Sequence, residues 1–213
     1  MAIKKDREYR NMILEVRTAD ETEPEQEERK IVRGYASTFN EPYTLYQDDD
    51  WRFDEVVDSH AFDNTDMTDV IMQYDHEGRV FARMSNNTLT VTPDEKGLLI
   101  EADLGGTELG RQLYEEIRGG YTNKMSFGFT VDGEAETKEM VDGTEVYTRT
   151  ITSVRKLYDV SAVSIPANDA TSISVRNLTD GVIEKIQAER LEAEALELRR
   201  RKLLVRAKLN GGQ

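Results

Sequence analysis

The sequence predicts a mainly β protein with a few helices: an antiparallel, β-barrel-like domain of about seven strands, followed by a helical tail. Two observations favour this fold class. Short segments of apolar or alternating residues follow one another, separated by glycine, proline, asparagine or aspartate. Helical spacing of apolar residues occurs in one short stretch, 107–118, and again near the C-terminus. We therefore expect a folded domain over residues 1–177 and a tail over 178–213.

Composition limits the function classes. The 213 residues, 38% of them hydrophobic, suffice for one sizeable core and an appendage. With 42 acidic against 28 basic residues the net charge is -14, which would repel nucleic acid and anionic membranes, so neither is expected as a partner. The absence of cysteine excludes disulfides, thiolate metal sites and a cysteine nucleophile. No run is long enough to span a membrane and the polar start lacks a signal peptide's apolar segment, so we expect a cytosolic protein.

In the N-terminal part, mixed alternation predicts a first strand over residues 9–18. The acidic stretch 20–28 is interpreted as a solvated loop. A strand is expected at 31–38, with a bulge at Gly34. Residues 40–51 are expected to be a long irregular segment.

The rest of the domain is expected to consist mostly of strands joined by tight turns. The expected elements are an apolar strand at 70–74, a hairpin of 89–92 and 98–102, a strand around residue 126, an acidic hairpin tip over 134–145 with turns at 132–133 and 142–143, and strands at 146–154 and 157–167. A helix at 107–118 is predicted from its cap, Thr107, from Leu109, Leu113 and Ile117 on one face, and from the glycines at 119–120 that end it.

Three residues are unusual for their surroundings, and Ser126 is the first. It places a small hydroxyl among the packing residues Met125, Phe127 and Phe129 of a predicted strand. Most serines in strands fill space or form local hydrogen bonds. Ser126 is therefore either such a filler or a nucleophile.

His76 is the second, because it follows the apolar run 70–74 at a glycine turn. Strand ends can give a catalytic group both rigid support and access, although an ordinary surface histidine fits as well. Zinc is not expected at residues 75–77, since adjacent strand side chains point to opposite faces and the chain has only two histidines. The aspartates at 48–50 lack the ligand spacing of a calcium loop. We expect no metal and no cofactor.

Asp159 is the third, because a carboxylate in the apolar run 157–167 needs a partner to offset its desolvation. Arg155 or Lys156 could supply a purely structural partner. Alternatively, Asp159 orients His76 while His76 takes the proton of Ser126, which is the arrangement used for acyl transfer.

Several segments, taken in order, resemble the HK97-type phage prohead (procapsid maturation) serine proteases, a family related in fold to the herpesvirus assembly proteases. The matching segments are 34–39 (GYASTF), Phe53, 55–57 (EVV), 61–62 (AF), 75–76 (DH) with Gly78, 125–129 (MSFGF), 157–161 (LYDVS), 166–168 (PAN) and Ala170. Together they cover about residues 10 to 176.

The resemblance implies three roles: Ser126 as nucleophile, His76 as general base and Asp159 as the acidic third member. In the herpesvirus relatives a second histidine fills the third role, but His60 stands where the phage family usually has a small residue and is left out of the site. Backbone amides near Gly128 or at 154–156 are candidates for the oxyanion hole.

The resemblance also implies an endopeptidase that cleaves scaffold and major capsid protein, and itself, inside the immature procapsid in the host cytoplasm. We expect a homo-oligomer. Two alternatives stay open: a non-enzymatic head-assembly or scaffold protein with the same fold, and a metal-dependent hydrolase using Asp75 and His76. Apolar residues spaced three or four apart over 180–209 predict a tail helix that packs on its own domain or pairs as a coiled coil, serving as a tether or being trimmed by self-cleavage.

Overall fold

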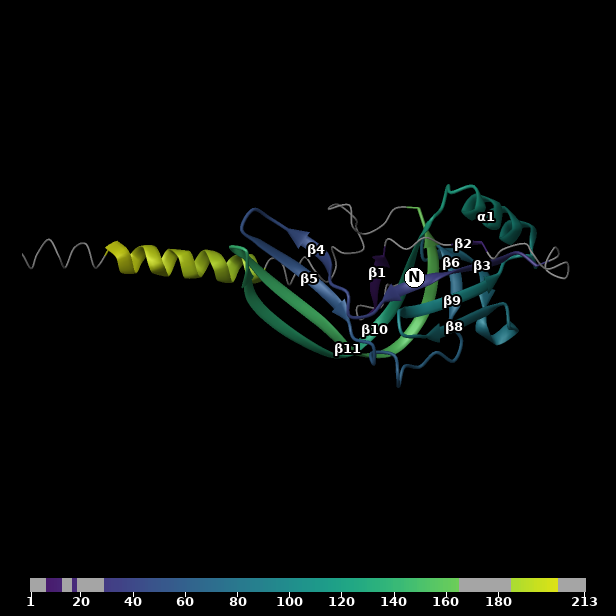
Figure 1. Cartoon of the computed structure of the whole chain (residues 1–213), viewed down its shortest axis with the longest axis horizontal. Helices are drawn as coiled ribbons and strands as arrows, with labels where there is room; N and C mark the ends of the chain where they lie inside the picture. Colours follow the sequence, from purple (N-terminus) through teal and green to yellow (C-terminus); the bar gives the residue numbers. More distant parts are fainter. Residues whose placement is uncertain (1–6, 13–16, 19–28, 165–184, 203–213) are drawn as a thin grey trace, which may run out of the picture. The chain divides into compact units, whose positions relative to one another are not determined.

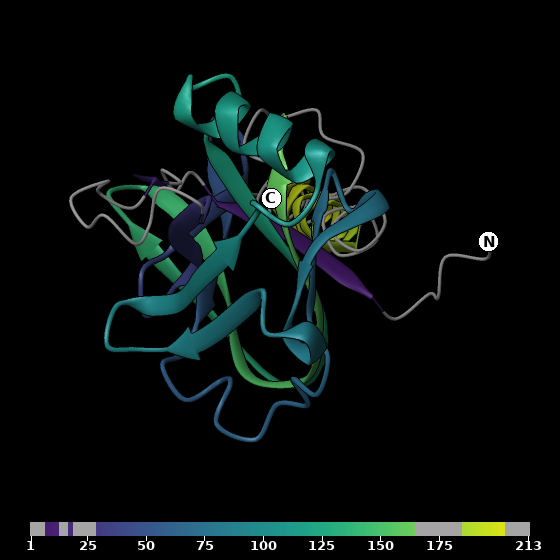
Figure 2. The same cartoon turned by 90° about the vertical axis from the view of Figure 1, so that its right-hand side faces the viewer.

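The fold is described from a computed structural model, which defines residues 7–12, 17–18, 29–164 and 185–202. The chain divides into two compact units, Met1–Val175 and Arg176–Gln213. The first unit is mainly β and is shown from two directions in Figures 1 and 2. Two α-helices are described, one in each unit, so the predicted fold class of strands with a few helices is confirmed.

The strands of the first unit form two sheets. The larger sheet has the order β1-β10-β11-β5-β4, with β6 pairing with β11 and with β7, and the smaller one has the order β2-β3-β9-β8. The strands are β1 (Glu8–Met12), β2 (Arg17–Thr18), β3 (Ile31–Thr38), β4 (Tyr43–Gln47), β5 (Trp51–Val57), β6 (Ile71–Tyr74), β7 (Glu77–Arg83), β8 (Leu89–Pro93), β9 (Gly97–Asp103), β10 (Lys124–Val141) and β11 (Thr144–Val163).

The predicted antiparallel barrel is corrected in two respects. Strand β11 pairs in parallel with both β5 and β6, so the larger sheet is mixed. Among the described residues the strands make two sheets and no closed barrel. Parallel pairing joins segments far apart in the chain, here β5 and β6 with β11, and local sequence patterns carry no signal for it.

Strands β10 and β11 form a long hairpin, visible in Figure 1 as two neighbouring curved ribbons. The predicted turn at Asp142 and Gly143 is confirmed: both residues have positive φ, 50° and 87°, as a tight hairpin turn requires. The predicted turn at Asp132 and Gly133 is wrong, because β10 continues through it with shifts of register. The two strands expected at 146–154 and 157–167 are a single strand, β11, up to Val163; residues 165–167 lie outside the described part.

Three other predictions are changed. The single strand expected at 9–18 is two strands, β1 and β2, which belong to different sheets. The stretch 40–51, expected to be irregular, contains β4 and the start of β5, joined by a turn at the aspartates 48–50. The bulge of β3 lies between Tyr35 and Ser37, not at Gly34. Strand β7 was not foreseen, and the acidic stretch 20–28 lies outside the described residues.

Helix α1 (Glu108–Arg118) begins as predicted at Thr107, whose side chain accepts a hydrogen bond from the amide of Gly110. It ends at Gly119, and Gly120 has the positive φ of 76° that favours glycine after a helix. The buried face differs from the prediction, because Tyr114 is buried with Leu113 and Ile117 while Leu109 is exposed. A 3-10 turn, η2 (Met84–Asn86), links β7 to β8.

One apolar core joins both sheets and α1. Its members come from β3, β8 and β9 of the smaller sheet, from β6, β10 and β11 of the larger one, and from the helix. Phe127 and Phe129 of β10 stack with ring centroids 4.5 Å apart inside it. The residues immediately before and after Ser126 on β10 are therefore packed and fully buried.

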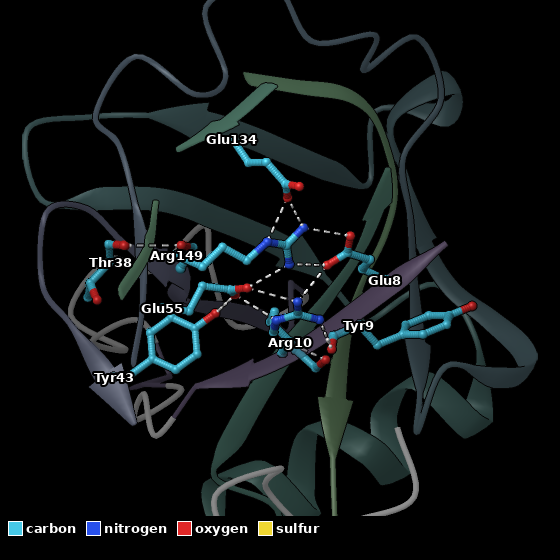
Figure 3. Close-up of polar contacts among 10 residues, drawn as sticks. Glu8, Tyr9, Arg10, Thr38, Tyr43, Glu55, Glu134 and Arg149 are labelled. Carbon is cyan, nitrogen blue, oxygen red and sulfur yellow. Dashed lines mark hydrogen bonds and ion pairs between the residues drawn. The ribbon is translucent and has the colours of Figure 1, made fainter. Parts of the chain in front are cut away.

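A buried cluster of charged side chains attaches β1 to the rest of the larger sheet (Figure 3). Arg10 donates from Nε and Nη2 to the two carboxylate oxygens of Glu55, at 2.6 and 2.8 Å. Arg149 of β11 lies between three carboxylates, donating to Glu8 at 2.8 Å, to Glu55 at 2.9 Å and to Glu134 from Nε at 2.7 Å. The hydroxyl of Tyr43 also donates to Glu55. We call Glu8, Arg10, Tyr43, Glu55, Glu134 and Arg149 the charge cluster.

The protonation of the charge cluster follows from mutual pairing. Burial by itself would lower the pKa of Arg10, but Glu55, Tyr43 and Glu8 raise it above its ordinary value. Burial raises the pKa of Tyr43 and Glu55 adds to that effect, so the phenol keeps its proton. Burial would raise the pKa of Glu8, yet the hydrogen bond from Arg149 and the charges of Arg10 and Arg149 hold it below its ordinary value. Mutual pairing thus holds Glu8, Arg10 and Arg149 in their charged forms, while Tyr43 stays neutral.

The second unit contains one described helix, residues 185–202. Ion pairs of i,i+4 spacing link Lys185 with Glu189 and Arg201 with Glu197 along it. Leu191, Leu196 and Leu198 are exposed. The rest of the predicted tail helix, 180–184 and 203–209, lies outside the described residues. Neither described helix is both long and apolar enough to cross a membrane.

Removing one charge from the cluster should destabilise the protein strongly. In Glu55→Gln, Arg10 and Arg149 stay buried with one of their two shared carboxylates removed, and we expect a loss of about 3 to 5 kcal/mol in the free energy of unfolding. Chemical denaturation followed by circular dichroism measures it. The matched control is Glu101→Gln, which breaks the exposed pair of Glu101 with Arg33 and should cost about 1 kcal/mol or less. Similar losses in both variants would show that the charge cluster does not anchor the sheet.

Candidate active site

The pairing of β10 with β11 places Ser126 and Asp159 on one face of the larger sheet. Ser126 lies opposite Ser161, and Gly128 lies opposite Asp159. Because side chains alternate along a strand, Ser126 and Gly128 share a face, as do Asp159 and Ser161. Ser126 and Asp159 are therefore diagonal neighbours. Gly128 has no side chain, which leaves room on that face for the carboxylate of Asp159.

His76 enters this face from the β6–β7 hairpin. Tyr74 pairs with Glu77, so Asp75 and His76 form a two-residue turn, and both have positive φ, 49° and 59°, as the type I′ turn requires. Parallel pairing of β6 with β11 places Tyr74 beside Ala162, which brings the turn over the end of β11. The predicted strand end is thus a tight hairpin.

Asp75 ties this turn to β11. Its carboxylate accepts hydrogen bonds from the amide and the hydroxyl of Ser164, both at 2.8 Å. Its own amide donates to the carbonyl oxygen of Ala162 at 2.9 Å. With its side chain bound in this way, Asp75 serves as an anchor for the turn, and the imidazole of His76 faces the other way, toward β10.

The structure brings the three predicted site residues into contact. The Nδ1 atom of His76 lies 2.5 Å from Oδ1 of Asp159, and Nε2 lies 2.5 Å from Oγ of Ser126. A carboxylate can only accept, so Nδ1 carries a proton and donates it to Asp159. In the neutral imidazole Nε2 is then a free acceptor facing the Ser126 hydroxyl. This is the geometry in which an imidazole can remove a proton from a serine.

The Ser126 hydroxyl has a second acceptor within reach. Its Oγ lies 2.8 Å from the backbone carbonyl oxygen of Arg10 on β1. A hydroxyl has one proton, so it donates either to Arg10 or to His76. Ser126 is also fully buried, at 0% exposure, whereas the His76 side chain is 13% exposed. A substrate therefore reaches Oγ only after a neighbouring segment moves.

Strand β1 supplies further contacts that the sequence did not suggest. The ring of Tyr9 packs on the His76 imidazole, with centroids 4.4 Å apart. In Figure 3 the Tyr9 side chain points away from the charge cluster, while Glu8 and Arg10 point into it.

On β11, Ser161 donates from its hydroxyl to Oδ1 of Asp159 at 2.8 Å. The one signal for Ser161 is its place two residues after Asp159, which puts it on the same face of a strand.

Other residues considered from the sequence lie elsewhere or are otherwise engaged. His60 is 81% exposed and pairs with Asp63. Lys156, a candidate structural partner for Asp159, forms its ion pair with Asp66 at 2.6 Å. The amide of Val154, a candidate oxyanion donor, already donates to the carbonyl of Ala61 at 2.8 Å. In the described part of the chain, no three His, Asp or Glu side chains are grouped to hold a metal ion.

A hydroxyl, an imidazole and a buried carboxylate in consecutive contact are an arrangement typical of serine hydrolases. The family model for caudovirus prohead serine protease matches residues 14–184, most of the chain, and the chain belongs to that family. The resemblance seen in the sequence is thereby confirmed. No curated protein and no solved structure shows significant similarity to the chain.

Gly128 should be indispensable to this geometry. A Cβ at this position would lie 2.4 Å from Oδ2 of Asp159 and 2.8 Å from Cε1 of Tyr9. We expect Gly128→Ala to push Asp159 from His76 and to lower the rate of peptide cleavage by about 100-fold, as misplacement by an ångström can. The control is Gly106→Ala, where a Cβ meets no atom within 4 Å. Full activity in a folded Gly128→Ala protein, with folding checked by circular dichroism, would contradict this view of the site.

Proposed function

We propose that the protein is a procapsid maturation endopeptidase that cleaves scaffold and major capsid protein, and itself, by a Ser-His-Asp mechanism. The observation that carries the proposal is the chain of contacts from Ser126 through His76 to Asp159 in a member of the prohead protease family. The three residues come from three separate strands or turns. Packing alone does not explain why they converge, because a buried carboxylate such as Asp159 costs free energy that its partners must offset.

In the proposed mechanism His76 is the base. Oγ of Ser126 attacks the carbonyl carbon of the scissile peptide bond as its proton passes to Nε2 of His76. The imidazolium is stabilised by Asp159, which holds Nδ1–H, and then protonates the leaving amine as the carbon–nitrogen bond breaks. Water attacks the resulting acyl-enzyme, giving its proton to Nε2, and release of the acid product restores the Ser126 hydroxyl.

The proposed setting follows from the family. The enzyme acts inside the immature procapsid in the host cytoplasm, with the phage capsid protein and scaffold as its partners. In this proposal the protease domain occupies residues 1–177, its fold is related to that of the herpesvirus assembly proteases, and residues 178–213, which include the helix at 185–202, serve as a tether. The exposed leucines 191, 196 and 198 are consistent with a tail that meets another chain.

A second candidate is a non-enzymatic head-assembly protein that keeps the protease fold. The complete burial of Ser126 and its contact with the Arg10 carbonyl favour this alternative, because a nucleophile must be reachable. They equally fit an enzyme that is latent until the shell assembles. Processing of co-expressed capsid protein separates the two, because a latent enzyme becomes active in the assembled shell and a non-enzymatic protein does not.

The first experiment is active-serine labelling. A peptidyl phosphonate should label the wild-type protein at one serine, Ser126, because a hydroxyl beside a neutral imidazole attacks phosphorus and an ordinary strand serine does not. Ser126→Ala should lose the label and the processing of co-expressed capsid protein. The matched control is Ser37→Ala, another fully buried strand serine, which should keep both. Processing of capsid protein by Ser126→Ala, in cells without another copy of the enzyme, would disprove the serine-protease proposal.

The two histidines provide a second test. His76→Gln should abolish cleavage, and wild-type cleavage should decline on the acid side of its pH profile as the imidazole is protonated and ceases to accept a proton. His60→Gln, which removes an exposed histidine, should keep most of the activity. Rates are measured on a peptide spanning a capsid processing site. Equal losses in both variants would point to a site that uses both histidines.

A further inference from the structure

The two carboxylate oxygens of Asp159 differ in their hydrogen bonds. Its Oδ1 atom accepts two hydrogen bonds, from Nδ1 of His76 and from Oγ of Ser161. Its Oδ2 atom is buried and has no hydrogen-bond donor among the described residues. A buried carboxylate oxygen without a donor is costly, so a compensating charge is expected nearby.

Arg7 supplies that charge. Its Nη1 atom lies 3.8 Å from Oδ2 of Asp159, too far for a hydrogen bond but close enough for an ion pair. The guanidinium lies over the ring of Tyr158, 3.7 Å from the centroid, and Nη1 donates to the hydroxyl of Tyr9 at 3.3 Å. The side chain is 29% exposed, so solvent screens it in part. Two aromatic side chains thus hold the cation beside the carboxylate.

We propose that Arg7 is a positioning residue of the site, which balances the charge of Asp159 and thereby sets how firmly His76 holds its second proton. The inference deepens the proposed function, in which His76 alternates between imidazole and imidazolium. Arg7 and protonated His76 are two cations that share one carboxylate, Asp159. Arg7 therefore disfavours the imidazolium and keeps His76 in the neutral form that can accept the proton of Ser126.

Other charged groups around His76 do not take this role. Asp75 has its carboxylate bound to Ser164, and Glu77, the next residue, is exposed to solvent. Lys156 lies near the same Tyr158 ring, 5.6 Å from its centroid, but its amino group pairs with Asp66. Within the described residues, Arg7 is the one Arg or Lys side chain within 4 Å of the Asp159 carboxylate.

The test follows the two histidines by NMR as pH is varied, in the wild-type protein and in Arg7→Gln. Loss of the Arg7 charge should let His76 keep its second proton to higher pH, so its titration curve should move upward in pH. Arg7→Lys, which preserves the charge, should restore most of the wild-type midpoint. His60, exposed and remote in sequence, is an internal reference that should not move, and Lys156→Gln is the matched control for loss of a neighbouring cation.

A midpoint of His76 that stays in place, or moves downward, in Arg7→Gln would overturn the inference, as would an equal shift in Lys156→Gln. A purely structural role for Arg7 would instead broaden or lose the native spectrum, and Arg7→Lys would not repair the midpoint. The NMR titration needs no catalysis, so it is independent of the proposed function. Processing of co-expressed capsid protein by the same variants reports on that function separately: absent processing by the wild type counts against the protease and leaves the titration result standing.

Discussion

The register between β10 and β11 is the constraint on which the site depends. It sets Gly128 against Asp159 and Ser126 against Ser161, so a hydroxyl and a carboxylate lie diagonally on one face of a sheet whose other positions are packed by Phe127, Val160 and their neighbours. A slip by one residue would turn every side chain to the opposite face. The apolar core therefore fixes the chemistry as well, because the same alternation that buries Phe127 and Phe129 directs Ser126 toward His76.

Strand β1 connects this site to the charge cluster. Its side chains alternate: Glu8 and Arg10 enter the cluster, while Tyr9 contacts the imidazole of His76. Its backbone supplies the Arg10 carbonyl that competes with His76 for the Ser126 proton. Burying such a cluster adds little net stability, because desolvating the charges offsets their attraction. It does, however, allow the edge strand β1 only one position on the sheet. We interpret the cluster as the feature that fixes β1 in register beside β10, the strand that carries Ser126.

The sequence predicted most of the elements and pointed to three residues that the structure places in contact, and the reason is physical. Ser126, His76 and Asp159 are polar residues in or next to apolar runs. Such exceptions to a local pattern can be recognised from the sequence alone. Their partners Arg7, Tyr9 and Ser161 are ordinary residues in ordinary surroundings, and their contacts arise from pairing between segments far apart in the chain. The parallel pairing of β11 with β5 and β6 has no local signature, and β4 was missed because the polar residues around it hid its alternation.

The burial of Ser126 limits how a substrate can reach it. Two walls enclose the hydroxyl, β1 and the β6–β7 hairpin, and they differ in what it takes to move them. Displacing β1 would separate Arg10 from Glu55, and breaking such a buried ion pair costs about 3 to 5 kcal/mol. The hairpin has no part in the charge cluster: it presents exposed residues 77–80 to solvent, and it is held to β11 by the pairing of β6 and by the contact of Asp75 with Ser164. Because His76 is already partly exposed on the hairpin side, we interpret that side as the approach to the Ser126 hydroxyl, with β1 as the wall behind it.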